Sequence, residues 1–467
     1  MSQGERPLYH LTVREAGDLI RRRQLSPVEL TRAFLERIQA VDGRLKTYVT
    51  LLAESAMAEA QAAEGEIARG GYRGPLHGIP VALKDLYDTK GVRTTAQSKV
   101  LEHRVPAEDA TTTARLRGAG AVLLGKLALH EFALGGPQTS IFEQARNPWD
   151  LERVTGGSSS GSGAAVAAGL CMASLGSDTG GSIRAPASLC GIVGLKPTYG
   201  LVSRYGVVPL SWSLDHCGPM TWTVEDAALV LQTIAGPDPK DPTTSAAPLP
   251  DYTQALREDV RGLRIGVPRH YFLEPRNGVE PETAAAVEQA LKDLEGLGAR
   301  VEEVTVPSLE YAWVANSVIL LAEAAAYHRR NLQARPREFG DIVRVRFFMG
   351  ALLSGVDYVQ AQRARSRVRR ELAEVLRRVD VLAAPTQPKP AARFQGFDPF
   401  AIGLTPSFTS PFNLAGVPAI SVPCGFSGEG LPIGLQIAVR PFDEPTVLRV
   451  AHTYERHAGW YRRRPRI

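Results

Sequence analysis

Two serines stand directly after pairs of glycines: Ser158 follows residues 156–157, and Ser182 follows residues 180–181. Gly/Ser text is typical of flexible linkers. However, residues 164–175, which lie between the two pairs, read AAVAAGLCMASL without a charge and must be buried. We therefore expect both serines in a folded site. A serine hydroxyl is a poor nucleophile near neutral pH and needs a base within hydrogen-bond reach.

Lys84 is the candidate base. The chain contains nine lysines against 45 arginines, and arginine cannot give up its proton in a protein. Lys84 follows the apolar run GIPVAL (78–83), which is expected to carry the side chain into the interior. Desolvation there favours a neutral amine, which can accept a proton. The alternative is a structural salt bridge between Lys84 and the adjacent Asp85.

One segment further along the chain resembles a phosphate-binding loop. Residues 120–126 (GAVLLGK) have its glycine and lysine spacing, but Leu127 replaces the Ser or Thr that would hold magnesium. The residues between the glycines are all apolar. We therefore interpret this segment as a buried strand.

Two sequence patterns of other serine hydrolases are alternatives to the serine-lysine site. Residues 157–161 (GSSSG) match G-x-S-x-G, yet that serine should follow a buried strand, and here the preceding residues 147–155 are polar and broken by proline. Asp215 and His216 could complete a Ser-His-Asp triad, but adjacent side chains of a strand face opposite ways. We interpret His216 as a histidine in a loop before Gly218.

The elements that would position these residues can be read from apolar runs. Residues 77–85 and 119–127 predict two short buried strands, and TTTARLRG (111–118) between them predicts a helix. This order favours a right-handed crossover in a parallel sheet. Further strands are predicted at 263–268, 301–307, 379–385 and 418–423, and further helices at 283–298 and 358–379. The fold class is therefore α/β, with a mixed, mostly parallel sheet between helices.

Composition limits the function classes. The chain has 54 basic and 49 acidic residues, and this excess is too small to argue for nucleic acid. Four cysteines without a C-x-x-C pair fit a reducing compartment and no structural metal. The N-terminus lacks the apolar centre of a signal peptide, and no stretch approaches the ~18 uncharged apolar residues of a membrane span. We expect a soluble, cytoplasmic protein that does not bind membranes.

Five motifs follow one another along the chain: GIPVALKD (78–85), GGSSSGSGAAVAAG (156–169), GSDTGGSIRAPASLCGIVGLKPTYG (176–200), SLDHCGPM (213–220) and SPFNLAGVPAISVPCGF (410–426). In this order they resemble the amidase signature family. The resemblance implies a Ser-Ser-Lys triad on an α/β/α fold. It also implies a single domain over residues 1–467, with a catalytic core at about 70–235 and 375–455 and a more variable segment at about 236–374.

The resemblance assigns roles residue by residue. It makes Lys84 the base, Ser158 the bridging serine and Ser182 the nucleophile, and it implies a cis peptide bond before Ser158. The chain departs from the family pattern at Ser160, where glycine is usual. The backbone N–H groups expected in the oxyanion hole belong to Thr179, Gly180 and Gly181. The supporting residues are Ser159, Asp178 and Arg184, the last two as a buried pair. The expected acyl pocket comprises Phe132, Gly135, Gly136 and the region 404–414, with Phe132 as its apolar wall.

The implied activity is hydrolysis of the C–N bond of a carboxylic amide through an acyl-enzyme, with esters and carbamates (urethanes) also open. No metal or organic cofactor is needed, and the partner is a small-molecule substrate of a monomer or homodimer. An alternative is the A subunit of a glutamyl-tRNA(Gln) amidotransferase, which uses the same triad on glutamine and passes ammonia to a partner. Residues 318–353 lack the R-x-E-G-F-G stretch of that alternative, which favours a stand-alone amidase. A binding protein that keeps the fold without chemistry is the third hypothesis, and the intact Lys84, Ser158 and Ser182 disfavour it.

Overall fold

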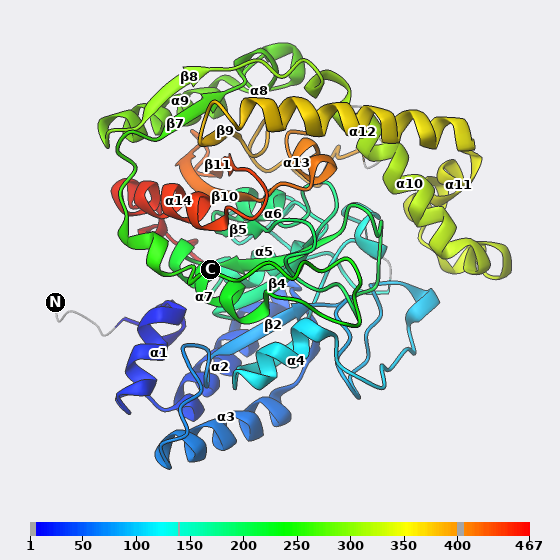
Figure 1. The fold of residues 1–467 in the computed structure, drawn as a ribbon. Coiled ribbons are helices and arrows are strands. Elements are labelled where there is room, and N and C mark those ends of the chain that lie inside the picture. Colours follow the sequence, from blue (N-terminus) through cyan, green and yellow to red (C-terminus); the bar gives the residue numbers. More distant parts are fainter. Residues whose placement is uncertain (1–5, 139–140, 399–405) are drawn as a thin grey trace.

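The computed structural model describes residues 6–138, 141–398 and 406–467. Within these residues one sheet of eleven strands runs through the molecule in the order β1-β3-β2-β4-β6-β5-β10-β11-β9-β7-β8. The strands are β1 (Tyr48–Leu51), β2 (Pro80–Lys84), β3 (Val122–Leu127), β4 (Ala173–Asp178), β5 (Val193–Lys196), β6 (His216–Thr221), β7 (Arg264–Val267), β8 (Arg300–Glu303), β9 (Val381–Pro385), β10 (Ala419–Phe426) and β11 (Pro432–Ala438). Figure 1 shows them stacked from β2 at the bottom to β7 and β8 at the top.

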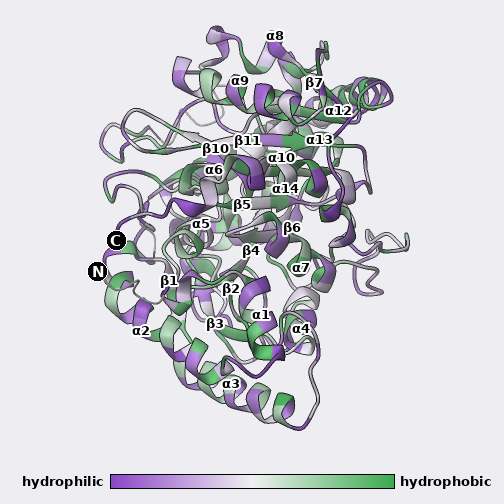
Figure 2. Cartoon of the chain, turned by 90° about the vertical axis from the view of Figure 1, so that its left-hand side faces the viewer, coloured by the Kyte–Doolittle hydropathy of each residue, from purple (hydrophilic) through white to green (hydrophobic). Residues whose placement is uncertain are grey.

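Helices cover the sheet, as Figure 2 shows with α1–α4 at one end and α8 and α9 at the other. Their bounds are α1 (Val13–Arg21), α2 (Pro27–Leu45), α3 (Ala53–Ala68), α4 (Thr111–Gly118), α5 (Ser160–Ala167), α6 (Arg184–Cys190), α7 (Val224–Ile234), α8 (Arg269–Phe272), α9 (Pro281–Gly296), α10 (Leu309–Ala334), α11 (Asp341–Leu352), α12 (Gly355–Val375), α13 (Ser410–Ala415) and α14 (Glu444–Ala458). Helices α5 and α6 pack on each other and on the central strands, while α14 packs on α7, α9 and β10.

The α/β class and the mixed sheet are confirmed. Strands β2 and β3 pair in parallel, with α4 between them in sequence as predicted. The predicted strands further along the chain are β7, β8, β9 and β10, and the predicted helices are α9 and α12. The sheet is not mostly parallel, however: six neighbouring pairs are antiparallel and four are parallel. Strand β6 follows β5, and β11 follows β10, without a helix in between, and both pairs are antiparallel as such connections allow.

The interpretation of residues 120–126 as a strand is confirmed. Residues 122–127 form β3, and Gly125 has a φ of +156° where a Cβ would collide with the carbonyl oxygen of Thr50 in β1. Glycine at this position therefore allows β1 and β3 to approach each other. The loop predicted around His216 is wrong, since His216 begins β6 and pairs with Asp178 of β4. The Gly-Pro pair at 218–219 suggested that the loop extends to these residues, but both of them lie within β6.

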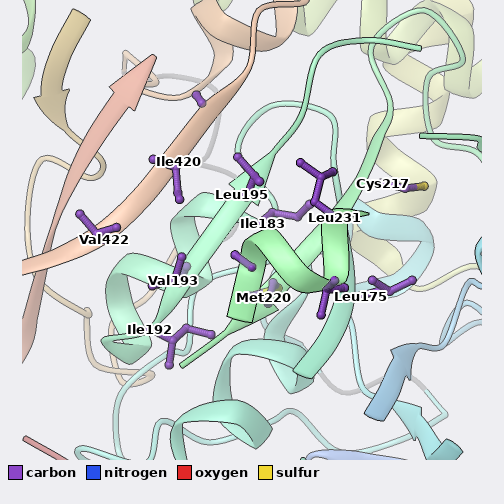
Figure 3. Packing of buried hydrophobic residues seen from close by; sticks show 14 of the residues in the cluster. Leu175, Ile183, Ile192, Val193, Leu195, Cys217, Met220, Leu231, Ile420 and Val422 are labelled. Atoms are coloured by element: carbon purple, nitrogen blue, oxygen red, sulfur yellow. The ribbon is translucent and has the colours of Figure 1, made fainter. Parts of the chain in front are cut away.

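The hydrophobic core lies where these central strands meet (Figure 3). Leu175 of β4, Leu195 of β5, Met220 of β6 and Ile420 of β10 are all buried there. Serines and a lysine interrupt the same strands at their ends. The core thus forms a rigid, apolar frame around a small polar site.

Helix α10 is long and apolar, although Glu310 and Glu323 interrupt its apolar run. Residues 309–334 contain an 18-residue window long and apolar enough to cross a membrane by composition alone. Half of that window is buried inside the protein, against α11, α12 and α13. This burial is what a core helix of a globular protein requires.

Candidate active site

Lys84 is the last residue of β2 and is completely buried. Its Nζ lies 2.8 Å from Ser158 Oγ, 3.0 Å from Ser159 Oγ and 2.9 Å from Ser177 Oγ. The predicted lysine and bridging serine are thus brought together although 74 positions separate them. Sequence reasoning named Ser159 only as a supporting residue and gave Ser177 no role.

The alternative salt bridge between Lys84 and Asp85 does not form. Adjacent residues of a strand point to opposite faces of the sheet, so Asp85 lies on the other face from Lys84. Asp85 instead pairs with Lys126 of β3 at 3.3 Å and accepts a 2.5 Å hydrogen bond from the Thr95 hydroxyl. Within the described residues, the Lys84 ammonium is therefore left without a carboxylate in contact.

Burial lowers the pKa of Lys84 to about 7, although the carboxylates of Asp178 and Asp215 act in the opposite direction. A substantial fraction of Lys84 is thus neutral near physiological pH. A charged ammonium donates to all three surrounding hydroxyls, whereas a neutral amine donates to two and accepts a hydrogen bond from the third. The same cage of serines therefore suits both protonation states, as a proton-shuttling group requires.

Ser158 is the serine best placed to exchange a proton with Lys84. Within the described residues, the only hydrogen bond of its hydroxyl is the one with Lys84 Nζ. The Ser159 hydroxyl, in contrast, donates to the Ser177 carbonyl and accepts from the Ser177 N–H, both at 3.3 Å. The Ser159 hydroxyl is thus held by the backbone of Ser177, whereas the Ser158 hydroxyl is free for a second partner; the bridging role of Ser158 stays a prediction.

The backbone around Ser158 has the expected form. The Gly157–Ser158 peptide bond is cis. A Cβ on Gly157 would collide with the His130 ring, and the backbone N–H of His130 donates to the Ser158 carbonyl at 3.0 Å. Ser160, where the family usually has glycine, is buried and donates a long 3.4 Å hydrogen bond to the Ala128 carbonyl. The extra hydroxyl thus anchors the start of α5 and does not reach Lys84.

Ser182 lies beside this pair, half-buried, at the end of the turn that follows β4. Its carbonyl accepts a 3.3 Å hydrogen bond from the Ser159 N–H, so the two glycine-serine turns touch. Its hydroxyl makes no hydrogen bond to the parts of the chain that the structure describes. Ser182 is therefore free for a substrate, and its proton transfer to Ser158 stays a prediction.

The turn that carries Ser182 is held by the buried pair of Asp178 and Arg184. The guanidinium donates to both carboxylate oxygens at 3.0 Å, and both side chains are fully buried. Burial raises the pKa of the Asp178 carboxyl, but Arg184 outweighs this effect and holds that pKa well below its usual range. Arg184 also donates to Gln436 and Asn413, which ties the turn to the C-terminal motif.

We expect Arg184→Met to lower the free energy of unfolding by about 3–5 kcal/mol, because it leaves the buried Asp178 carboxylate without its partner. Urea unfolding followed by circular dichroism measures this change. The matched control is Arg261→Met, which removes an exposed pair with Asp259 and should leave the free energy of unfolding nearly unchanged. Equal losses in the two variants would contradict the bracing role of Arg184.

The predicted oxyanion hole needs one correction. The Gly181 N–H donates to Asp178 Oδ1 at 2.7 Å, so it is already used within the turn. The N–H groups of Thr179 and Gly180 remain the candidate donors. The sequence could not reveal this, because it does not show which N–H groups the Asp178 carboxylate accepts.

Asp215 contacts the turn that carries Ser182, although the sequence suggested it only as a member of a Ser-His-Asp triad. Its buried carboxylate accepts a 2.6 Å hydrogen bond from the Thr179 hydroxyl and further bonds from the N–H groups of Leu210 and Ser211. Burial raises its pKa to about 6. Asp215 therefore fixes the Thr179 side of the turn, and it has no part in a Ser-His-Asp triad because His216 Nδ1 contacts the carbonyls of Leu214 and Asp178.

A cavity of about 200 Å³ reaches the serine cage at Ser177. Its lining is mainly apolar and includes four charged side chains. The lining residues are Ala133, Ser177, Arg204, Tyr205, Val207, Val208, Pro209, Leu210, Trp212, Asp215, Cys217, Lys240 and Asp241.

The residues expected in the acyl pocket do not line this cavity. Phe132 is buried and packs against His328, Phe339 and Phe347, so it belongs to an aromatic cluster and not to the walls of this cavity. Gly135 packs against Val343, and Gly136 has a φ of +71°. Residues 404 and 405 of the predicted region 404–414 lie outside the described residues. Thr409 of that region donates a 2.6 Å hydrogen bond to the Gly180 carbonyl.

Among the described residues, no group of three or more His, Cys, Asp or Glu side chains could hold a metal ion. All four cysteines are free and buried.

Known proteins share this sequence and fold along most of the chain. The model of the family described as Amidase matches residues 29–448. The chain is 48% identical to the A subunit of the glutamyl-tRNA(Gln) amidotransferase of Moorella thermoacetica, over 98% of this chain and 99% of that protein. Its structure resembles that of the corresponding A subunit from Thermotoga maritima (TM-score 0.83, 39% identity, 96% and 95% of the chains covered). It also resembles the peptide amidase of Stenotrophomonas maltophilia (TM-score 0.84, 33% identity, 97% and 98% covered).

Proposed function

The chain belongs to the amidase family, and on this premise we propose that it is a glutaminase of the kind found as the A subunit of amidotransferases, with Ser182, Ser158 and Lys84 as its triad. The single observation that carries the proposal is the 48% identity, over 98% of the chain, to a protein named as the A subunit of a glutamyl-tRNA(Gln) amidotransferase. This proposal replaces the stand-alone amidase favoured by residues 318–353. Those residues form α10 and α11 beyond the serine cage, so their differences do not change the triad.

In the proposed reaction, neutral Lys84 takes the proton of Ser158 while Ser158 takes that of Ser182. The Ser182 oxygen attacks the carboxamide carbon, and the N–H groups of Thr179 and Gly180 stabilise the oxyanion. One such donor typically contributes about 2.7–4 kcal/mol to the transition state. When the C–N bond breaks, the proton returns through Ser158 to the nitrogen and ammonia leaves. Water then cleaves the acyl-enzyme by the same relay, which restores the Ser182 hydroxyl.

Because the relatives are named as parts of an amidotransferase, the proposal includes partner chains that receive the ammonia, within the cytoplasm. The division into a core (70–235 and 375–455) and a variable segment (236–374) is part of the same proposal.

We expect the purified chain to release ammonia from L-glutamine with a higher kcat/KM than from propionamide or from C-terminal peptide amides. An enzyme-coupled ammonia assay measures all three, with Ser182→Ala as the blank. A preference for peptide amides would contradict the glutaminase proposal and favour a peptide amidase, the activity named for one structural neighbour. Equal rates in the wild type and the blank would contradict both.

A further inference from the structure

A second cavity lies where residues 6–15 meet residues 452–464. Its volume is about 520 Å³, against about 200 Å³ for the cavity that reaches the serine cage. Its walls come from the first described residues, the start of α7, the end of α14 and the residues that follow α14. The two cavities share no lining residue. A ligand in the second cavity would therefore not touch the proposed triad.

Arginine is the most frequent residue in the lining of this second cavity. Arg6 pairs with Glu15 at 2.8 Å, and Arg14 pairs with Glu225 at 2.7 Å. Three further lining arginines form no ion pair with the part of the chain that the structure describes: Arg456, Arg462 and Arg464. The cavity thus collects positive charge that the protein itself does not neutralise.

The other titratable groups of the lining do not remove this excess. Glu455 accepts hydrogen bonds from the Val224 N–H on both oxygens, at 3.0 and 3.2 Å, and burial raises the pKa of its carboxyl well above the usual range. Burial also lowers the pKa of His452, and it lowers that of His10 to about 4 with the help of Arg464. Even with Glu455 ionised, five arginines against three glutamates leave two positive charges.

Aromatic rings hold the three unpaired guanidinium groups. The Arg464 guanidinium carbon lies 3.9 Å from the centre of the Trp222 ring. Those of Arg456 and Arg462 lie 5.9 and 5.7 Å from the centre of the Tyr461 ring. The Trp222 indole N–H donates to the Tyr461 carbonyl at 2.9 Å, which joins the two rings. A guanidinium over a ring uses its face, so the N–H groups at its edge stay available to an anion.

Arg464 is the best placed of the three. It is half-buried, and within the described residues its hydrogen bond goes to the His10 carbonyl at 3.0 Å. Burial and the nearby charge of Arg6 lower the pKa of its guanidinium to about 10. Withdrawing a charge from water is costly unless the charge is paired. The position of Arg464 is therefore explained best by an anion that enters the cavity.

We propose that this second cavity binds a small phosphate-bearing anion through Arg456, Arg462 and Arg464. A phosphate group carries a charge of about −1.5 to −2 at pH 7 and three strong acceptor oxygens, whereas a carboxylate carries one charge and two oxygens. Two excess positive charges spread over three guanidinium groups match the phosphate. Arginine also pairs with phosphate through two parallel hydrogen bonds, which fixes the ligand.

Isothermal titration calorimetry of the full chain with pyrophosphate tests the proposal. We expect one site per chain, with an affinity about tenfold lower in Arg464→Gln because charge-assisted hydrogen bonds are lost. Arg462→Gln should also weaken binding, and because Arg462 is exposed this variant does not disturb packing. The matched control is Arg463→Gln. Arg463 stands between the two in sequence but lies over the Phe426 ring at 3.8 Å, outside the cavity, so its variant should bind within about two-fold of the wild type.

Further titrations identify the source of the phosphate. Tighter binding of ADP than of pyrophosphate supports an organic phosphate, and the reverse order supports an inorganic one. A wild type that does not bind pyrophosphate, an equal loss in Arg463→Gln, or tighter binding of succinate would overturn the proposal. Binding of unfractionated tRNA that depends on Arg464 and resists pyrophosphate would assign the arginines to nucleic acid and also overturn it. None of these results bears on the proposed glutaminase, because the cavity contains no residue of the triad.

Discussion

Lys84→Arg lowers kcat/KM for amide hydrolysis by about 10²- to 10⁴-fold, the usual contribution of a general base. Arginine keeps the charge and much of the length of lysine, but its guanidinium stays protonated and cannot take the proton of Ser158. Steady-state ammonia release across pH 6 to 10 measures the loss. A thermal melt shows that the variant is folded.

The wild-type profile belongs to the same prediction. Because burial lowers the pKa of Lys84 to about 7, the protonated lysine dominates below that pH and the neutral base above it. The kcat/KM should therefore rise as the pH passes through about 7 and level off above that pKa, while Lys84→Arg stays flat and low. Lys84→Ala should be impaired to a similar degree, and Ser158→Ala somewhat less, since a water can partly replace the bridging hydroxyl.

Lys126→Arg is the matched control for Lys84→Arg. Lys126 is also buried at the end of a strand, but it pairs with Asp85 on the other face of the sheet, and arginine retains that pair. We expect its kcat/KM to stay within a few-fold of the wild type. An Lys84→Arg variant with near wild-type turnover would remove Lys84 from the mechanism.

Ser182→Ala lowers kcat by about 10⁶-fold, as the loss of a nucleophile does in serine hydrolases. The hydroxyls of Ser158 and Ser159 do not substitute, because they are held in the cage around Lys84. Single-turnover assays with a chromogenic amide or ester measure both acylation and the residual rate. The control is Ser160→Gly, which restores the usual family residue next to the bridge and should leave kcat nearly unchanged. A Ser182→Ala variant that keeps more than a hundredth of the rate would contradict the assignment.

The sequence predicts those parts of the fold that depend on local patterns of apolar residues. The apolar runs before Lys84 and after Gly120 predict β2 and β3 because buried parallel strands are apolar on both faces. The same reasoning indicates that Lys84 is buried. The resemblance then supplied which serines belong with it, and the structure brings Lys84 and Ser158 into contact.

The remaining features depend on contacts between distant segments. Asp85 pairs with Lys126 because β2 and β3 lie in register, and Thr179 is held by Asp215 because β4 and β6 are neighbours. Neither pair can be predicted from the local sequence, because its two members lie far apart in the chain. Strand β6 was not predicted, because its glycine and proline at 218–219 indicated a turn. The use of the Gly181 N–H by Asp178 depends on how tightly the turn closes.

Peptide mapping by mass spectrometry after brief reaction with a fluorophosphonate, repeated from pH 6 to 9, tests whether Ser182 is a nucleophile activated through neutral Lys84. We expect one adduct, on Ser182, formed faster as the pH rises through about 7. An adduct on Ser158 or Ser159, or labelling of Ser182 at a rate independent of pH, would contradict it.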